Sequence, residues 1–166
     1  RPAALDVLGD YAAALIDSGA FGDAEKVYKQ MLEKDSDNAR AMDGLILVYD
    51  VTGDSEKRIE ILLKYLKSFP DDYQHCAKLA QVYEKTGRTK MAADVYEQLV
   101  RMNPGVPQPL WRLGDMHMSV GQYEKAREVY ERALALGTGG RLESLRKLAM
   151  VCDKLGDIET RLVLLD

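Results

Sequence analysis

The chain has 166 residues, the length of one ordinary domain, and its 23 Lys and Arg against 27 Asp and Glu give a net charge of −4. This acidic balance argues against nucleic acid or an anionic membrane surface as a partner, because either would need a basic stripe. The longest apolar stretch, Leu45 to Tyr49, is far too short to insert into a bilayer, and two cysteines cannot form a disulfide framework.

Apolar residues at helical spacing predict ten helices, and glycines separate them in pairs. In chain order the predicted pairs are 5–17 and 21–35, 39–51 and 55–68, 73–85 and 89–102, 107–119 and 123–136, and 142–154 followed by a helix from 158 to the end. We expect Asp54 and Asp157 to cap the helices that follow them. Pro70 and Pro104 should follow the ends of second helices, while Pro107 and Pro109 suit a first turn.

Glycine recurs in the turns at a fixed interval. Gly19, Gly53, Gly87 and Gly121 are 34 residues apart, and Gly156 follows at 35. The same interval separates the large residues Tyr28, Leu62, Tyr96 and Tyr130. A helix that ends in a left-handed residue favours glycine, so the interval marks one repeated helical hairpin.

A helical hairpin of 34 residues resembles the tetratricopeptide repeat (TPR). The closest match is in the fourth repeat, where Leu113, Gly114, Ala126, Tyr130 and Ala133 occupy the family's large, small and aromatic positions. The resemblance implies an all-α fold, a right-handed α-solenoid of stacked helix–turn–helix hairpins whose first helices line a concave wall. We predict one domain over 1–166, with repeats 5–38, 39–72, 73–106, 107–140 and a partial repeat 142–166.

No residue pattern indicates catalysis, a metal or a cofactor. His75 and Cys76 are adjacent, but helix neighbours point about 100° apart and cannot share a hydrogen bond with good geometry. We expect a buried thiol beside a surface histidine, and a second core thiol at Cys152. His117 stands where other repeats carry tyrosine, and we expect it to be partly buried. Unpaired core thiols are compatible with either the cytoplasm or the periplasm.

Two arginines depart from the family's small-residue rule. Arg58 and Arg161 stand where other repeats carry alanine, and each follows an aspartate by four residues, Asp54 and Asp157. We expect each arginine stem to pack over its hairpin while the charged head reaches that aspartate.

Three functions fit the resemblance. The favoured one is a non-catalytic protein–protein interaction scaffold that holds a peptide or helix of a partner in the concave groove. A second is a TPR segment of a larger enzyme, or of a polysaccharide-export or assembly machine, that recruits substrate or partner subunits. A third is a self-assembly module that stacks through uncapped ends, because the run from Leu162 to Leu165 would lack a covering helix in what we read as a fragment of a longer array.

By the family's geometry, the groove is lined by exposed positions of the first helices, and this wall carries more acidic than basic residues. The predicted partner-binding residues are Asp43, Leu47, Asp50, Gln81, Trp111, Asp115, Met118 and Met150. Acidic residues and adaptable methionines indicate a basic and partly apolar partner segment, anchored at Trp111. The alternative is that Trp111 only packs between first helices.

Overall fold

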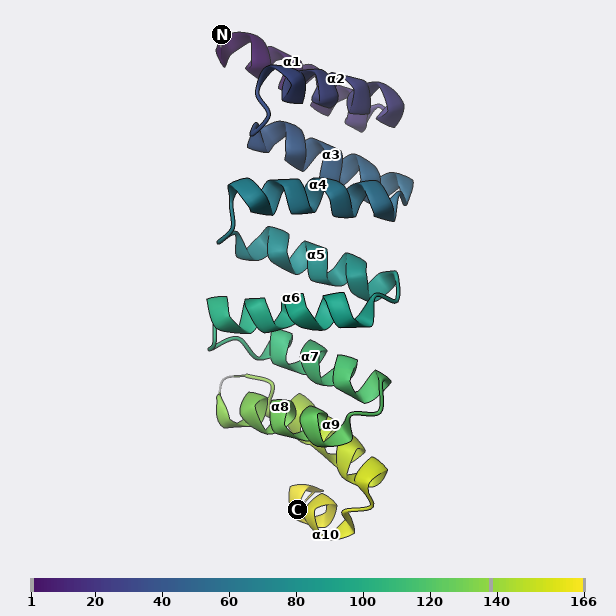
Figure 1. Cartoon of the computed structure of the whole chain (residues 1–166), viewed down its shortest axis with the longest axis vertical. Helices are drawn as coiled ribbons and strands as arrows, with labels where there is room; N and C mark the ends of the chain where they lie inside the picture. The colour runs from purple at the N-terminus through teal and green to yellow at the C-terminus, as the bar shows by residue number, and fades with distance from the viewer. Residues whose placement is uncertain (1, 138, 166) are drawn as a thin grey trace. The chain divides into compact units, whose positions relative to one another are not determined.

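The computed structural model describes residues 2–137 and 139–165, and within them the side chains of 4–137 and 139–161. These residues form helices joined by short turns and no strand (Figure 1). The helices are α1 (Pro2–Asp17), α2 (Phe21–Lys34), α3 (Ala39–Thr52), α4 (Ser55–Ser68), α5 (Tyr73–Lys85), α6 (Thr89–Met102), α7 (Pro107–Ser119), α8 (Tyr123–Ala135), α9 (Arg141–Leu155) and α10 (Ile158–Leu165). All ten predicted helices are confirmed, and the main difference is that α1 begins at Pro2 instead of residue 5.

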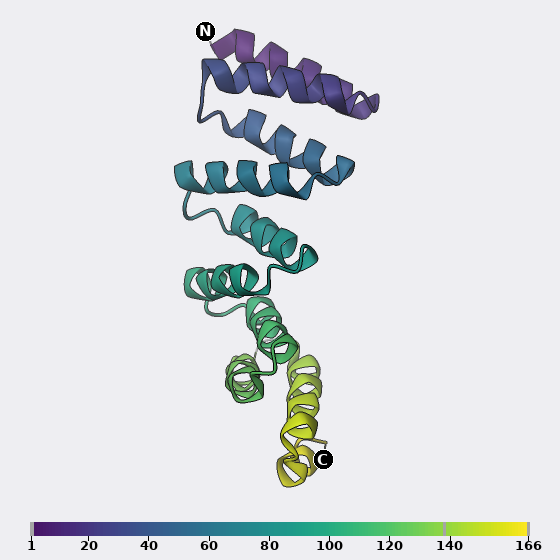
Figure 2. The same ribbon diagram turned by 45° about the vertical axis from the view of Figure 1, so that its right-hand side comes forward.

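The chain divides into two compact units, residues 1–82 and 83–166, so the boundary falls within α5. In the first unit α1 packs on α2, α2 on α3, and α3 on α4. In the second unit the same succession runs from α6 to α10. First helices of successive hairpins also touch, α1 with α3 and α7 with α9, and Figure 2 shows α1 beside α2 from a second direction. Each unit is therefore a stack of helical hairpins, as predicted.

The turn between α3 and α4 shows why glycine recurs. Gly53 ends α3 with φ 76°, a left-handed conformation that other residues adopt only at a cost, and its four periodic equivalents share it. The next residue, Asp54, caps α4 by accepting a hydrogen bond from the Lys57 backbone amide at 3.2 Å. Asp157 accepts one from the Thr160 amide at 3.1 Å. Both predicted caps are confirmed.

The prolines also take their predicted places. Pro107 and Pro109 lie in the first turn of α7, where a missing backbone N–H leaves no helical bond unmade. The second helices α4 and α6 end two residues before Pro70 and Pro104. Proline therefore punctuates the chain at both ends of its hairpins.

Tyrosine rings lie against glycines in the core of both units. A Cβ atom added at Gly44 would lie 2.2 Å from the ring of Tyr28, and one at Gly114 would lie 2.2 Å from the ring of Tyr130. Both tyrosines are buried. The missing side chain thus lets a second helix approach a first helix closely in each unit.

The prediction for the two arginines is wrong in its choice of partner. Arg58 pairs with Asp50, and Arg161 pairs with Asp153 at 3.0 Å, in each case an aspartate of the preceding first helix. Asp54 instead pairs with Lys57 at 3.0 Å. The arginine crosses its hairpin toward the end of the first helix, so the partner lies eight residues back across the turn and not four residues back along one helix.

Within the part of the chain that the structure describes, no helix is both long enough and apolar enough to cross a membrane. The side chains of Leu162 to Leu165, which we expected to form an uncovered end, lie outside the described residues.

Candidate functional site

The eight predicted partner-binding residues fall into two groups, one in each unit, and all lie on first helices. The first unit holds Asp43, Leu47, Asp50 and Gln81, and the second holds Trp111, Asp115, Met118 and Met150. Each group is described by itself.

In the second unit, a surface pocket of about 300 Å³ brings together three of the four predicted residues. Its lining comes from α7, α8 and α9 and consists of Asp115, Met118, Ser119, Tyr130, Lys147 and Met150. The two methionines differ in exposure: Met118 is partly buried, and Met150 is 52% exposed. A pocket bordered by flexible thioether side chains can adapt to apolar groups of different shapes.

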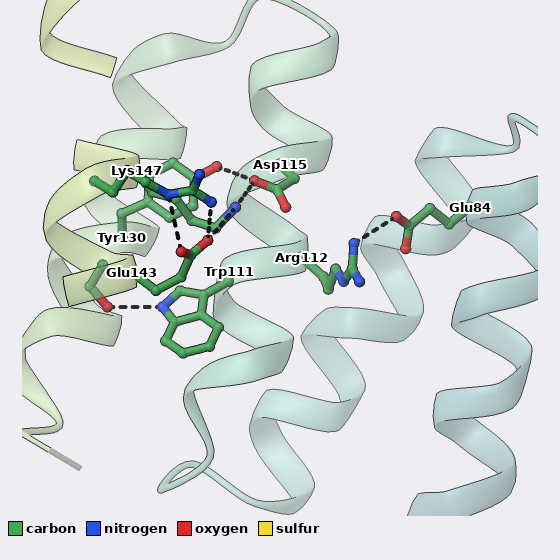
Figure 3. Close-up of polar contacts among 9 residues, drawn as sticks. Glu84, Trp111, Arg112, Asp115, Tyr130, Glu143 and Lys147 are labelled. Carbon is green, nitrogen blue, oxygen red and sulfur yellow. Dashed lines mark hydrogen bonds and ion pairs between the residues drawn. The ribbon is translucent and has the colours of Figure 1, made fainter. Parts of the chain in front are cut away.

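Asp115 is engaged inside its own unit. Its Oδ1 accepts hydrogen bonds of 2.6 Å from the Tyr130 hydroxyl and from the Lys147 ammonium group, which also lies 3.6 Å from Glu143 (Figure 3). Burial first, and then the hydrogen bond to Asp115, raise the pKa of Tyr130 well above its ordinary value. The Asp115 carboxylate is therefore balanced by Lys147, and the charge of the pocket is close to neutral.

Sequence reasoning did not select Tyr130 and Lys147 as site residues. Tyr130 carried a signal as a member of the periodic tyrosine set, which was interpreted only as core. Lys147 follows Asp115 by 32 residues, close to one repeat, so two first helices bring the pair together. A search for opposite charges about one repeat apart would have found it.

Trp111 lies between two first helices, as the alternative interpretation held. Its indole N–H donates to the hydroxyl of Ser144 at 2.8 Å, and Figure 3 shows the ring turned toward α9. The ring also lies against Gly140, where an added Cβ would be 2.3 Å away. Trp111 is not among the residues that line the pocket, so its use as an anchor for a partner stays a prediction.

In the first unit, Asp43, Leu47 and Asp50 lie along one face of α3. The side chains of Asp43 and Asp50 are 47% and 46% exposed, and Leu47 is 47% exposed. Gln81 is exposed on α5. Each aspartate has a cationic or imidazole partner, Arg58 for Asp50 and His75 for Asp43, yet keeps nearly half of its surface open.

The prediction that His75 lies at the surface is wrong. The residue is 7% exposed, its ring is stacked on Tyr65 with centroids 3.7 Å apart, and its Nε2 lies 2.6 Å from Asp43 Oδ1. Its Nδ1 lies 3.0 Å from Asp72, whose Oδ1 accepts a hydrogen bond from the His75 backbone amide. Burial acts to raise the pKa of Asp72, but the bonds from the His75 amide and ring outweigh it and lower that pKa. The neighbouring thiol of Cys76 is buried, as predicted.

The remaining candidates for chemistry have structural surroundings. Cys152 is buried, as predicted, and burial raises the pKa of its thiol. His117 is partly buried, as predicted, and its Nδ1 lies 2.9 Å from the Gln122 side-chain oxygen. Among residues 4–137 and 139–161, no three His, Cys, Asp or Glu side chains are grouped so that they could hold a metal ion.

The sequence matches the tetratricopeptide repeat family over residues 10–73 and again over 77–141. The chain belongs to the tetratricopeptide repeat family. Membership agrees with the repeated hairpins, with the glycine in each turn and with the tyrosine–glycine contacts of the core. The resemblance inferred from the sequence is thus confirmed, and the fold is that of the family's α-solenoids.

Solved structures of other TPR proteins are similar to this chain. A crystal structure of the protein MamA is 19% identical with a TM-score of 0.80, and the match covers 99% of this chain and 90% of that one. MamA from Desulfovibrio magneticus RS-1 is 17% identical with a TM-score of 0.74, covering 97% and 90% of the two chains. YrrB, described as a TPR protein with an unusual peptide-binding site, is 19% identical with a TM-score of 0.73, covering 96% and 81%. No curated relative matches the chain by sequence. At these identities the likeness shows the shared fold alone.

Proposed function

We propose that this chain is a non-catalytic protein-interaction scaffold that binds a segment of a partner protein on its first helices. The observation that carries the proposal is the pocket of about 300 Å³ formed by α7, α8 and α9, with Met118 and Met150 at its border. Repeat proteins of this kind present extended surfaces on which a partner peptide or helix can lie. YrrB, which has the same fold, is described as having a peptide-binding site.

The partner segment we propose has an apolar side chain for this pocket. Because Lys147 balances Asp115, the pocket itself favours an apolar group over a charged one. Methionine is common at surfaces that accept varied apolar partners, because its side chain is unbranched and polarisable.

The basic character of the partner is proposed from α3. Leu47 lies between Asp43 and Asp50 on one face of that helix, and the two carboxylates stay close to half exposed. A lysine or arginine of the partner would meet acceptor oxygens on both sides of an apolar side chain. Such contacts are made at the edge of an interface, so they should speed association and weaken with salt.

A displayed library of peptides of about 12 residues, selected against the full chain, tests this function. We expect enrichment of peptides with one or two large apolar residues and Lys or Arg beside them. Met150→Lys should weaken their binding by about tenfold, because it places a charge beside Lys147 at the mouth of the pocket. Leu142→Lys is the matched control: Leu142 is 80% exposed on the same helix and lines no part of the pocket. Peptides that bind both variants equally well would show that the contact surface lies elsewhere.

Self-association is a second candidate function, and exposed residues of α1 favour it. Val7 and Tyr11 are 67% and 56% exposed, whereas their equivalents one repeat later, Ala41 and Leu45, are buried beneath the preceding hairpin. A hairpin from a second copy could cover this face in the same way. Light scattering over a range of concentrations tests the idea. Association that Tyr11→Lys abolishes supports it, and a concentration-independent monomer contradicts it.

A further inference from the structure

A second kind of pocket occurs once in each unit, at positions that correspond by the repeat. In the first unit, a pocket of about 290 Å³ lies between α2 and α4 over α3. In the second, a pocket of about 370 Å³ lies between α6 and α8 over α7. Adding 68, which is two repeats, to the first set gives the second: Lys29 and Glu97, Leu32 and Val100, Leu45 and Leu113, Tyr49 and His117, Lys57 and Lys125, Glu60 and Glu128, Ile61 and Val129, Lys64 and Arg132. Arg101 also lines the second pocket.

Both pockets have an apolar floor below a charged rim. Leu45 and Ile61 form the floor in the first unit, and Leu113 and Val129 form it in the second, with each of the four less than a tenth exposed. The pocket of the second unit adjoins another of about 330 Å³, and Glu97 and His117 line both of them. Together they follow α6 from Thr89 to Arg101, about 18 Å at the rise of a helix. This length suits a helix of a few turns.

The rims carry more cations than anions in a chain that is acidic overall. In the first unit three lysines face Glu60, and in the second Arg101, Lys125 and Arg132 face Glu97 and Glu128. Lys29 is paired with Glu25, Lys57 with Asp54, and Arg101 with Glu97. Within the described residues, the equivalent cations Lys64 and Arg132 have no such partner.

The cations are a property of alternate repeats. One position of the second helices holds Gln30, Lys64, Gln98 and Arg132, and the position seven residues earlier holds Asp23, Lys57, Met91 and Lys125. Both cations are therefore present in repeats two and four and absent from repeats one and three. A charge pattern that recurs at the same two pockets and skips the repeat between them is a specific feature of these pockets, not a general surface charge.

From this pattern we infer that the second-helix pockets, those lined in part by Lys64 and by Arg132, bind an acidic amphipathic helix of a partner protein. The apolar side chains of that helix would lie over the floor residues, and its carboxylates would meet the unpaired cations of the rim. The inference is separate from the proposed first-helix function, because this pair of pockets shares no lining residue with the pocket beside Met150.

The test uses a fluorescent amphipathic peptide of about 16 residues, with leucines at helical spacing and glutamates elsewhere, and a second peptide in which lysines replace the glutamates. Fluorescence anisotropy with the full chain should show saturable binding of the glutamate peptide, and binding of the lysine peptide at least about tenfold weaker. The double variant Lys64→Gln and Arg132→Gln, which introduces the residue of repeats one and three, should weaken the glutamate peptide by about fivefold. Methyl NMR signals of Ile61 and Val129 should shift on binding.

A matched control separates the pockets from the net charge. The double variant Lys67→Gln and Lys154→Gln removes the same charge from exposed positions that line neither pocket, and it should bind like the original chain. Equal weakening by both double variants, equal binding of the lysine peptide, or no saturation up to about 1 mM would each overturn the inference. If Met150→Lys abolishes binding while the Lys64 and Arg132 changes do not, the peptide occupies the first-helix pocket, which overturns this inference and leaves the proposed function standing.

Discussion

The indole ring of Trp111 occupies the space that a side chain at Gly140 would need. A Cβ atom on Gly140 would lie 2.3 Å from the ring, and Gly140 has φ 105°, a backbone conformation that residues with a side chain rarely adopt. This glycine begins α9, so the entry of the chain into the fifth repeat is shaped around a tryptophan of the fourth.

Replacing Gly140 with alanine should destabilise the second unit by about 2–3 kcal/mol, through backbone strain and through the displaced ring. Gly139→Ala is the control one residue away, because a Cβ there meets open space and the backbone is not left-handed. Urea unfolding of both variants measures the difference in free energy of unfolding. Equal losses for the two variants would contradict the role of the Trp111 ring.

The hydrogen bond from Trp111 to Ser144 supports a second prediction. Ser144 is 1% exposed, so Trp111→Phe would leave a buried hydroxyl without its donor and should cost about 1–2 kcal/mol. Adding Ser144→Ala to that variant should recover part of the loss, because no polar group is then left unsatisfied. The double-mutant cycle gives the coupling free energy directly. A coupling close to zero would mean that the bond contributes nothing to stability.

The pairing of Arg58 across its hairpin can be tested in the same way. Double-mutant cycles with alanine should give a coupling of about 0.5–1 kcal/mol between Arg58 and Asp50. The cycle between Arg58 and Asp54 should give less than about 0.3 kcal/mol, because Asp54 is engaged with Lys57 and with the start of α4. The reverse order of couplings would restore the partner expected from helix spacing.

The alkaline limb of the stability profile should depend on Tyr65. Burial first, and then the hydrogen bond to Asp72, raise its pKa to about 12, against about 10 in an unfolded chain. The folded state therefore holds this proton more tightly, so its contribution to stability is complete below about pH 10 and is lost as the pH rises toward 12. Urea midpoints measured over this range should fall less steeply in Tyr65→Phe. Tyr11→Phe, at a ring that is 56% exposed, should keep the original slope, and an unchanged slope in Tyr65→Phe would refute the assignment.

The elements that could be predicted from the sequence are those set by local backbone chemistry. Gly53 could be placed because a left-handed helix end favours glycine, and Asp54 because a carboxylate after that glycine caps the next helix. Repetition multiplied each of these signals by the number of repeats. The helix bounds followed almost to the residue.

The contacts that could not be predicted join different helices. His75 occupies a helix position that is exposed by periodicity alone, and it is buried because Tyr65, from the preceding hairpin, stacks on its ring. The partner of Arg58 was misplaced for the same reason, since helix spacing finds neighbours on one helix and the true partner lies on another. In the candidate site, Asp115 and Met150 were predicted, but the lysine that neutralises Asp115 was not.

The alternation of Gln30, Lys64, Gln98 and Arg132 makes the hairpin the unit of folding and a pair of hairpins the unit of surface chemistry. An array lengthened by 68 residues would keep glutamine and cation in strict alternation along its second helices. An array lengthened by a single hairpin would set two like positions side by side and shift every later one out of phase. Growth by duplication would therefore preserve this surface only in even steps, although odd steps would preserve the fold equally well.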